Sequence, residues 1–239
     1  DGDPVRAELT GEAIRLTRVL RKLLPEEPEV AGLLGLLLLT DSRREARVRN
    51  GQLVLLGEQD RAGWDRALIT EGHNLVRECL AVNRPGRYQI LAAISAVHTD
   101  APTASDTDWS QVVALYDQLI RLDPSPIVAL NRAVAVAELD GPKVALTLID
   151  RLPLPGYHAW HVARADMLRR LGRSAEAKES YDAAILATQA RGLVAVGARA
   201  RMPIRFHVEP PAQIKLALAV PRSVLRQQGG KICRRIPEV

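Results

Sequence analysis

Two histidines with helical spacing are the residues best suited to hold a metal ion. His158 and His161 lie three residues apart, and Asp166 follows in the same predicted helix. A zinc site normally uses three or four ligands, and Cys79 and Cys233 are too far apart in the chain to read as part of one. We therefore expect structural or surface histidines, with no metal and no cofactor.

Motifs of known enzyme classes are missing from the sequence. It contains no Gly-x-Ser-x-Gly, no phosphate-binding Gly-x4-Gly-Lys-Ser/Thr and no His-Glu-x2-His. The paired carboxylates Glu26, Glu27 and Glu29 fall in the first turn of a predicted helix, where negative charge complements the helix dipole. We therefore predict no catalytic residues and a protein that is not an enzyme.

Polar residues at helix starts and within apolar helices are the candidates for binding a partner. Arg164 lies 32 residues after Arg132, so the two arginines occupy comparable places in successive repeats. Two interpretations stay open: an internal ladder of hydrogen bonds and ion pairs between helices, or a polar stripe that grips a partner peptide. The candidate set comprises Asp106, Asp108, Trp109, Asn131, Arg132, Arg164 and Asp166.

The composition favours a core built from helices. Of the 239 residues 47% are apolar but only 3% are aromatic, and Phe206 is the single phenylalanine. A core of Leu, Ala and Val suits closely packed helices better than a β-sandwich. The two cysteines form no disulfide framework, so a reducing cytoplasm is the expected location.

The longest apolar run, Val30 to Leu39, has ten residues. A membrane-spanning helix needs about 20, so we expect a buried core helix and no membrane partner. No secretory signal opens the chain, which begins without Met. We therefore expect a processed product or a piece of a longer protein.

The positive charge is concentrated at the carboxy-terminal end. Residues 190–239 hold ten Lys and Arg against two acidic residues, a net charge of +8, which leaves −3 for residues 1–189 out of the total of +5. Any DNA binding should therefore be indirect or non-specific and come from this tail. We hypothesise that the tail is a shifted reading frame or a lineage-specific extension, poorly ordered in either case.

In the first hundred residues, helical periodicity predicts helices at about 5–24, 28–39, 61–82 and 88–98. One apolar face of the first helix is expected to hold Ile14, Leu16, Val19, Leu20 and Leu23.

A basic cluster and a hairpin are expected between the second and third of these helices. Asn50–Gly51 favours a short hairpin or loop near 47–56. The cluster before it is either a solvated face or a patch for an acidic partner, and it comprises Arg43, Arg44, Arg47 and Arg49.

The second hundred residues have clear helix boundaries. Asp108 and Gln111 have capping-box spacing, in which each side chain bonds the other residue's backbone N–H. Ser125–Pro126 and Gly141–Pro142 predict two further helix starts. We expect helices near 108–122, 126–139, 142–152, 157–171 and 174–189, joined by short connections as antiparallel hairpins.

A spacing recurs through these helices. Val112-x3-Tyr116-x2-Leu119 is followed by Ala145-x3-Ile149-x2-Leu152 and by Ala177-x3-Tyr181-x2-Ala184, at steps of 33 and 32 residues. This is the period of a two-helix solenoid unit. Tyr116 and Tyr181 are expected to fill the gap to the next repeat, and small residues should lie where helix backbones approach: Ala133, Ala145, Ala165 and Ala177.

The region from Trp109 to Ala184 resembles tetratricopeptide repeats in degenerate form. Four longer strings resemble the carboxy-terminal extension of a group of bacterial extracytoplasmic-function sigma factors, members of the sigma-70 family of RNA polymerase subunits. The strings are GQLVLLGEQDRAGWDRALITEG (51–72), YQILAAISAVHTDAPTASDTDW (88–109), PSPIVALNRAVAVAELDGP (124–142) and RADMLRRLGRSAEAKESYDAAI (164–185).

This resemblance implies an all-α fold, an antiparallel helical-hairpin repeat (tetratricopeptide-like) solenoid with a short excursion near 47–56. The expected parts are an amino-terminal helical subdomain (1–100), the repeats (101–189) and the basic tail (190–239).

The resemblance also implies a non-catalytic regulatory module. Its expected partners are core RNA polymerase or sigma regions two and four, through which it would modulate transcription initiation. Since those two regions do not precede Asp1, we do not expect this chain to initiate transcription itself. The alternatives are a free-standing tetratricopeptide-like scaffold or antagonist, and a small-molecule sensor with a pocket inside the superhelix.

Overall fold

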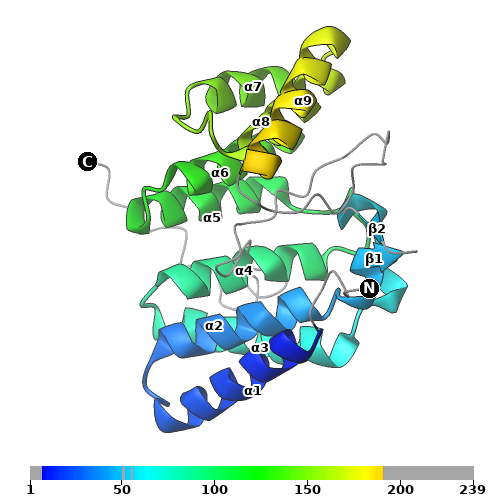
Figure 1. Ribbon diagram of the computed structural model, residues 1–239. Coiled ribbons are helices and arrows are strands. Elements are labelled where there is room, and N and C mark those ends of the chain that lie inside the picture. The colour runs from blue at the N-terminus through cyan, green and yellow to red at the C-terminus, as the bar shows by residue number, and fades with distance from the viewer. Residues whose placement is uncertain (1–6, 50–51, 55, 191–239) are drawn as a thin grey trace. The chain divides into compact units, whose positions relative to one another are not determined.

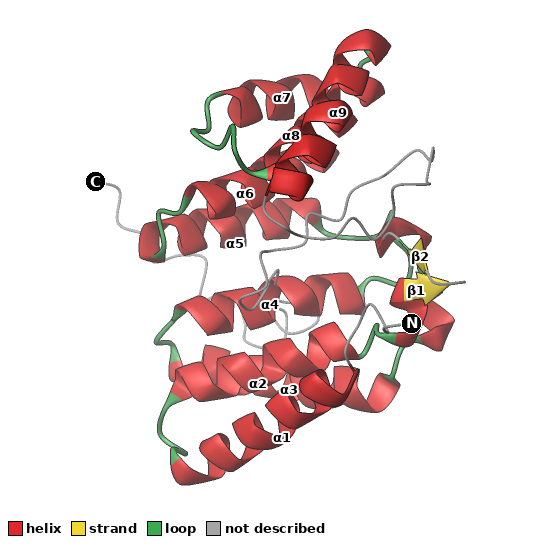
Figure 2. Cartoon of the chain, in the orientation of Figure 1, coloured by secondary structure: helices red, strands yellow, loops and turns green. Residues whose placement is uncertain are grey.

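The structure, a computed structural model, describes residues 7–49, 52–54 and 56–190. This part of the chain is helical apart from one two-stranded hairpin, three short 3-10 turns and loops (Figures 1 and 2). The all-α class is therefore confirmed. The described residues form two compact parts. The first part comprises residues 7–46 and 60–111. The second part comprises residues 112–190 and the described positions of 47–59.

The first part is built around α2 (Pro28–Asp41), which packs against α1 (Ala7–Leu23), α3 (Arg66–Val82) and α4 (Arg87–Asp100). Its sequence is apolar nearly all round, and eight of its fourteen residues are buried. The expectation of a buried core helix here is confirmed. Gly32 allows α2 and α4 to approach closely, because a Cβ at this position would lie 2.6 Å from the backbone N of Gln89.

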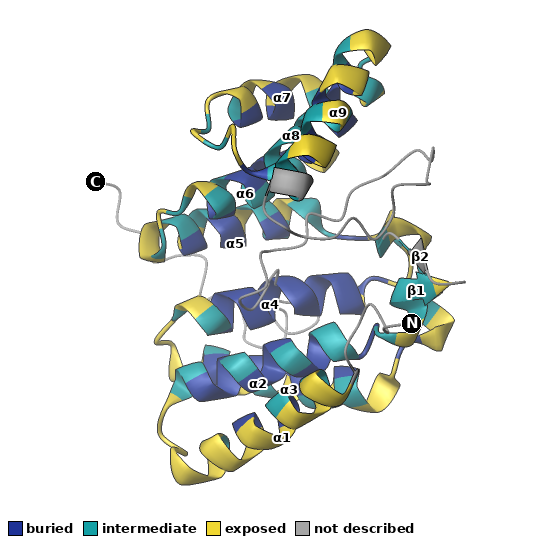
Figure 3. Cartoon of the chain, viewed as in Figure 1, coloured by how far each residue is buried: buried dark blue, intermediate teal, exposed yellow. Residues whose placement is uncertain are grey.

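Helix α4 is buried along most of its length. Every residue from Gln89 to Thr99 is buried, including polar ones (Figure 3). His73 of α3 is also buried, and its Nε2 lies 2.8 Å from Thr99 Oγ1. Since the Thr99 hydroxyl donates to the carbonyls of Ser95 and Ala96, the His73 ring must donate from Nε2.

The rest of the first part is irregular and lies around the ends of these helices. It includes a 3-10 turn at Arg61–Gly63 and most of another at Glu45–Arg47, whose last residue belongs to the second part. Arg43 is only 6% exposed. The solvated-face interpretation is therefore wrong at this residue, because Arg43 comes just after Ser42, the cap of α2, and is buried there. Arg44 pairs with Asp41 and Glu45.

The second part begins with the expected hairpin. Strand β1 (Val48–Arg49) pairs antiparallel with β2 (Gln52–Leu53), with Val48 opposite Leu53. The predicted turn residues, Asn50 and Gly51, lie outside the described residues. A 3-10 turn at Leu56–Glu58 follows.

The second part continues with α5 (Trp109–Leu122), whose first turn belongs to the first part, α6 (Pro126–Leu139), α7 (Pro142–Asp150), α8 (His158–Arg170) and α9 (Ser174–Ala190). Successive helices pack on one another: α6 on α7, α7 on α8, and α8 on α9. The small residues predicted at helix crossings are all buried: Ala133, Ala145, Ala165 and Ala177. Tyr116 is buried as well, whereas Tyr181 is half-buried.

Local signals set most helix boundaries. The Ser125 hydroxyl accepts the N–H of Ile127, and prolines occupy the first positions of α6 and α7. Helix α7 ends at Asp150, two residues before the predicted end, because Leu152 precedes a proline and that position disfavours helical backbone.

The predicted capping box at the start of α5 is half present. Asp108 Oδ1 accepts the N–H of Gln111 at 3.2 Å. The prediction of a reciprocal bond from the Gln111 side chain is wrong, because its Oε1 is buried without a hydrogen-bond partner among the described residues. The Ser110 hydroxyl instead adds a second bond to Asp108 Oδ1.

Candidate functional site

The predicted partner-binding arginine of α6 forms an ion pair between neighbouring helices. Arg132 Nε lies 2.6 Å from Asp117 Oδ1 of α5, and its Nη2 lies 3.4 Å from Oδ2. The Arg132 side chain is 28% exposed and that of Asp117 45%. A guanidinium that engages both carboxylate oxygens fixes the relative rotation of the two helices.

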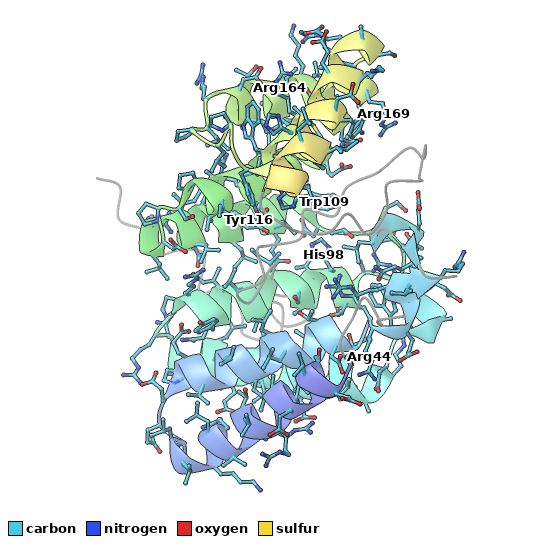
Figure 4. The ribbon with its side chains drawn as sticks, viewed as in Figure 1. Arg44, His98, Trp109, Tyr116, Arg164 and Arg169 are labelled. Atoms are coloured by element: carbon cyan, nitrogen blue, oxygen red, sulfur yellow. The ribbon has the colours of Figure 1, made fainter. Side chains whose placement is uncertain are left out.

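The same arrangement recurs one repeat later. Arg164 of α8 donates from Nε to Asp150 Oδ1 of α7 at 2.8 Å, and from Nη1 to Ser180 Oγ of α9 at 2.8 Å (Figure 4). Arg164 therefore joins three consecutive helices. Arg132–Asp117 and Arg164–Asp150, which we call the two rungs, match the internal-ladder interpretation of these arginines.

The other two candidates in this part also have mainly internal surroundings. Asp166 is 7% exposed and accepts from Arg169 Nη2 at 2.6 Å (Figure 4). Tyr181 lies close to this pair. Burial, and to a lesser extent the negative charge of Asp166, raises the pKa of Tyr181. Asn131 is half-buried, and its Oδ1 has no hydrogen-bond partner among the described residues.

In the first part, two candidate carboxylates shape the loop before α5. Asp106 Oδ2 accepts from the backbone N of Thr103 at 3.1 Å and from its hydroxyl at 2.7 Å. Asp108 caps α5 as described above. Both carboxylates are thus explained by loop and helix-start geometry, and nothing in their contacts requires a partner.

Trp109 lies beside the carboxyl end of α4, where Arg61 makes contacts that the sequence did not indicate. Its ring meets that of His98 edge-on, with 5.4 Å between centroids (Figure 4). Arg61 donates from Nη1 to the carbonyl oxygens of His98 and Ala101 at the end of α4, and stacks 4.6 Å from the Trp64 ring. Burial lowers the pKa of Arg61. Arg61 therefore caps the carboxyl end of α4.

The histidines considered as metal ligands have local contacts. His158 stacks edge-on against Tyr157, and His161 Nε2 lies 2.7 Å from the carbonyl oxygen of Pro155. Within the ranges that the structure describes, no group of three or more His, Cys, Asp and Glu side chains is placed to share a metal ion.

A small cavity lies in the first part between the start of α2 and the end of α3. Its volume is about 90 Å³, and its lining includes Pro28, Cys79 and Arg84. Burial raises the pKa of the Cys79 thiol to about 12, and the thiol donates to the carbonyl of Pro28. The cavity is much smaller than the roughly 300–1,000 Å³ of typical ligand pockets, and its cysteine is held protonated.

The first helix exposes its leucines. Ile14 packs into the core, but the other residues predicted to share its face lie on the opposite side and are exposed. The single-face prediction for α1 is therefore wrong. The packed side instead carries Thr17 and two arginines, Arg18 and Arg21, which pair with Glu71 and Glu78 of α3. We call the exposed set the α1 leucine face: Leu9, Leu16, Val19, Leu20 and Leu23.

Comparison with known proteins links the start of the chain to a family without an assigned function. Residues 1–80 match DUF6596. An uncharacterized protein of Rhizobium meliloti (strain 1021) is 48% identical over 190 residues. The similarity covers 78% of this chain and 45% of that protein, so the chain spans less than half of its relative's length. No solved structure matches the chain.

The family match covers α1, α2 and most of α3, and therefore includes the α1 leucine face. The two rungs lie beyond it. Among the described helices, none combines the length and the apolar composition that crossing a membrane requires.

Proposed function

We propose that the chain is a non-catalytic protein-interaction module of an RNA polymerase sigma factor, working in the cytoplasm. It would modulate transcription initiation by contacting core polymerase or sigma regions two and four. The observation that carries the proposal is the recurrence of an arginine–aspartate rung in successive helix pairs. Arg164 follows Arg132 by 32 residues and Asp150 follows Asp117 by 33, and each pair joins neighbouring helices.

Such a recurrence is typical of stacked helical hairpins, in which each pair contacts its neighbours and the stack presents an extended surface. Solenoids of this kind bind other proteins more often than they form catalytic pockets. The described residues favour this role over a ligand pocket, because Arg164 and Asp166 are engaged in internal contacts and the cavity beside Cys79 is too small for a typical ligand. The small-molecule sensor is therefore the weaker alternative.

The sigma-factor context rests on the four strings quoted above, between residues 51 and 185. The coverage of the relative supports a module role, since a segment that matches 45% of a longer protein fits one part of a multi-part chain. Direct DNA binding concerns residues 190–239, all but the first of which lie beyond the described ranges, and stays a prediction.

The test is direct binding with purified components. The full 239-residue chain is immobilised, and core polymerase, sigma regions two and four, and an unrelated helical protein are passed over it. We expect saturable binding to core polymerase or to the sigma regions only. Binding to neither, by protein whose circular dichroism shows folded helices, overturns the sigma-factor role.

A matched pair of variants identifies the surface. Lys178→Glu alters an exposed side chain on α9 that pairs with Asp182 one turn away, so the fold should be unaffected. Asp182→Lys is its partner on the same exposed face. If the outer face of α9 contacts the sigma regions, both variants lower the affinity, whereas unchanged binding assigns the contact to another surface of the chain.

A further inference from the structure

The α1 leucine face is the largest exposed apolar row on a single helix in the described chain. Leu23 is 71% exposed, Leu9 59% and Leu16 53%. The other exposed large apolar residues of the described ranges are single side chains near helix ends or pairs, such as Ile185 and Leu186. Contiguous apolar surface of this kind marks an interface, whereas scattered apolar residues do not.

The leucines are spaced symmetrically. Leu9, Leu16 and Leu23 lie seven residues apart, so they form one row along α1, and Leu20 lies beside the row one turn after Leu16. Leu16 is the midpoint of the row. When a second copy of the helix lies antiparallel with Leu16 against Leu16, Leu9 of one copy meets Leu23 of the other at both ends.

The charges on α1 have the same symmetry. Arg15 is paired with Glu12, Arg18 with Glu71 and Arg21 with Glu78. That leaves Glu8 near the start of the helix and Lys22 near its end, neither with an ion pair in the part of the chain that the structure describes. They are 14 residues apart, which places them within about 40° of each other around the helix axis.

An antiparallel pair brings these unpaired charges together. In a two-fold pair of this kind the same flank of each helix meets itself, so Glu8 of one copy faces Lys22 of the other, and the converse holds at the far end. In a parallel pair opposite flanks would meet, so the two copies of Glu8 would lie on opposite sides of the interface and neither would face Lys22. Antiparallel alignment also opposes the two helix dipoles favourably.

The geometry points to a second copy of this chain as the occupant of the α1 leucine face, bound antiparallel about a two-fold axis at Leu16. The contact is one helix wide, and α1 has 17 residues and is about 25 Å long. Interfaces of this size are weak. The dimer is therefore reversible, and its population rises with protein concentration.

Sedimentation of the full chain over a concentration series tests self-association. We expect a shift from monomer to dimer for the native chain, and a monomer throughout for Leu16→Glu. Leu186→Glu, on α9, is the matched control and should dimerise as the native chain does. Leu16 is more than half exposed, so circular dichroism and the melting temperature should be unchanged. A native chain that stays monomeric overturns the proposal.

Charge reversal tests the orientation. Glu8→Lys alone and Lys22→Glu alone should each weaken the dimer, because each places like charges opposite one another. The double variant restores opposite charges and should recover the native dissociation constant. A double variant as weak as the single ones contradicts the antiparallel arrangement.

Cysteine cross-linking gives a second measure that does not depend on affinity. In a Cys233→Ser background, in which Cys79 is buried, Leu16→Cys should form a disulfide-linked dimer on mild oxidation. Leu9→Cys and Leu23→Cys should cross-link when mixed, but not singly. Efficient cross-linking of Leu9→Cys or Leu23→Cys with itself would indicate a parallel pair and overturn the proposal.

Discussion

Glu29 of α2 occupies the space that a side chain at Gly86 would need. Its Oε2 accepts the backbone N–H of Tyr88 at 2.9 Å, and its Oε1 accepts that of Gln89 at 3.1 Å. A Cβ at Gly86 would overlap the Glu29 carboxylate. The start of α4 is thus capped by a residue from another helix, since Gly86 has no side chain with which to cap it.

Gly86→Ala should destabilise the first part by about 1–2 kcal/mol, because it displaces Glu29 and removes a helix cap. The backbone itself allows alanine, since Gly86 has φ −119°. Urea unfolding provides the measurement. In a Glu29→Ala background the same change should cost much less, and an equal cost in both backgrounds would contradict the contact. Gly11→Ala, with open space around it, should stabilise the protein slightly.

Arg132→Ala should lower the free energy of unfolding by about 1 kcal/mol, because the ion pair with Asp117 is only partly buried. Asp117→Ala should have a similar effect, and the double variant should cost little more than either single one. Partner binding by the folded variant should be unchanged. Lost binding at native stability would favour the polar-stripe interpretation instead.

The buried His73 predicts acid sensitivity. Burial, together with the nearby charge of Arg77, lowers its pKa from 6.5 to about 4. Between these values the unfolded chain binds a proton that the folded chain does not, so stability is complete above pH 6.5 and is lost as the pH falls toward 4. The loss is of the order of 3 kcal/mol, at about 1.36 kcal/mol for each pH unit between the two pKa values.

Urea unfolding between pH 4 and pH 7 measures this loss. His73→Gln should flatten the pH dependence. The same slope in His73→Gln as in the native chain would show that another group is responsible.

Ala177→Leu should destabilise the second part by about 1–3 kcal/mol, because Ala177 is 4% exposed and its site has no room for a larger side chain. Ala175→Leu, at an exposed position two residues earlier in α9, is the matched control. Melting temperatures measured side by side decide the matter, and an unchanged value for Ala177→Leu would count against close packing at this crossing.

The helix positions could be predicted because their signals are local. Pro28, Ser125–Pro126 and the small residues such as Ala145 set the helix starts and crossings through their own backbone and size. The side on which α1 packs could not be predicted in this way. Its leucines indicate an apolar face, but the side that packs carries Arg18, which faces α3 because Glu71 lies opposite, 53 residues later in the chain.

The candidate site was predictable to the same extent. The 32-residue step from Arg132 to Arg164 is a sequence feature, and it led to the two rungs. Their partners, Asp117 and Asp150, depend on how neighbouring helices cross, which no local pattern specifies. Arg61 was missed for the same reason, since the carbonyls that it caps lie at His98 and Ala101.

The two rungs also affect how genetic data on this protein should be interpreted. In a screen for alleles that have lost the proposed regulatory role, substitutions at Arg132 or Arg164 will be recovered because they lower the amount of folded protein in the cell. Such alleles would be mistaken for contact mutants unless protein abundance is measured with the phenotype. Alleles that keep normal abundance will instead identify the surface that meets the partner.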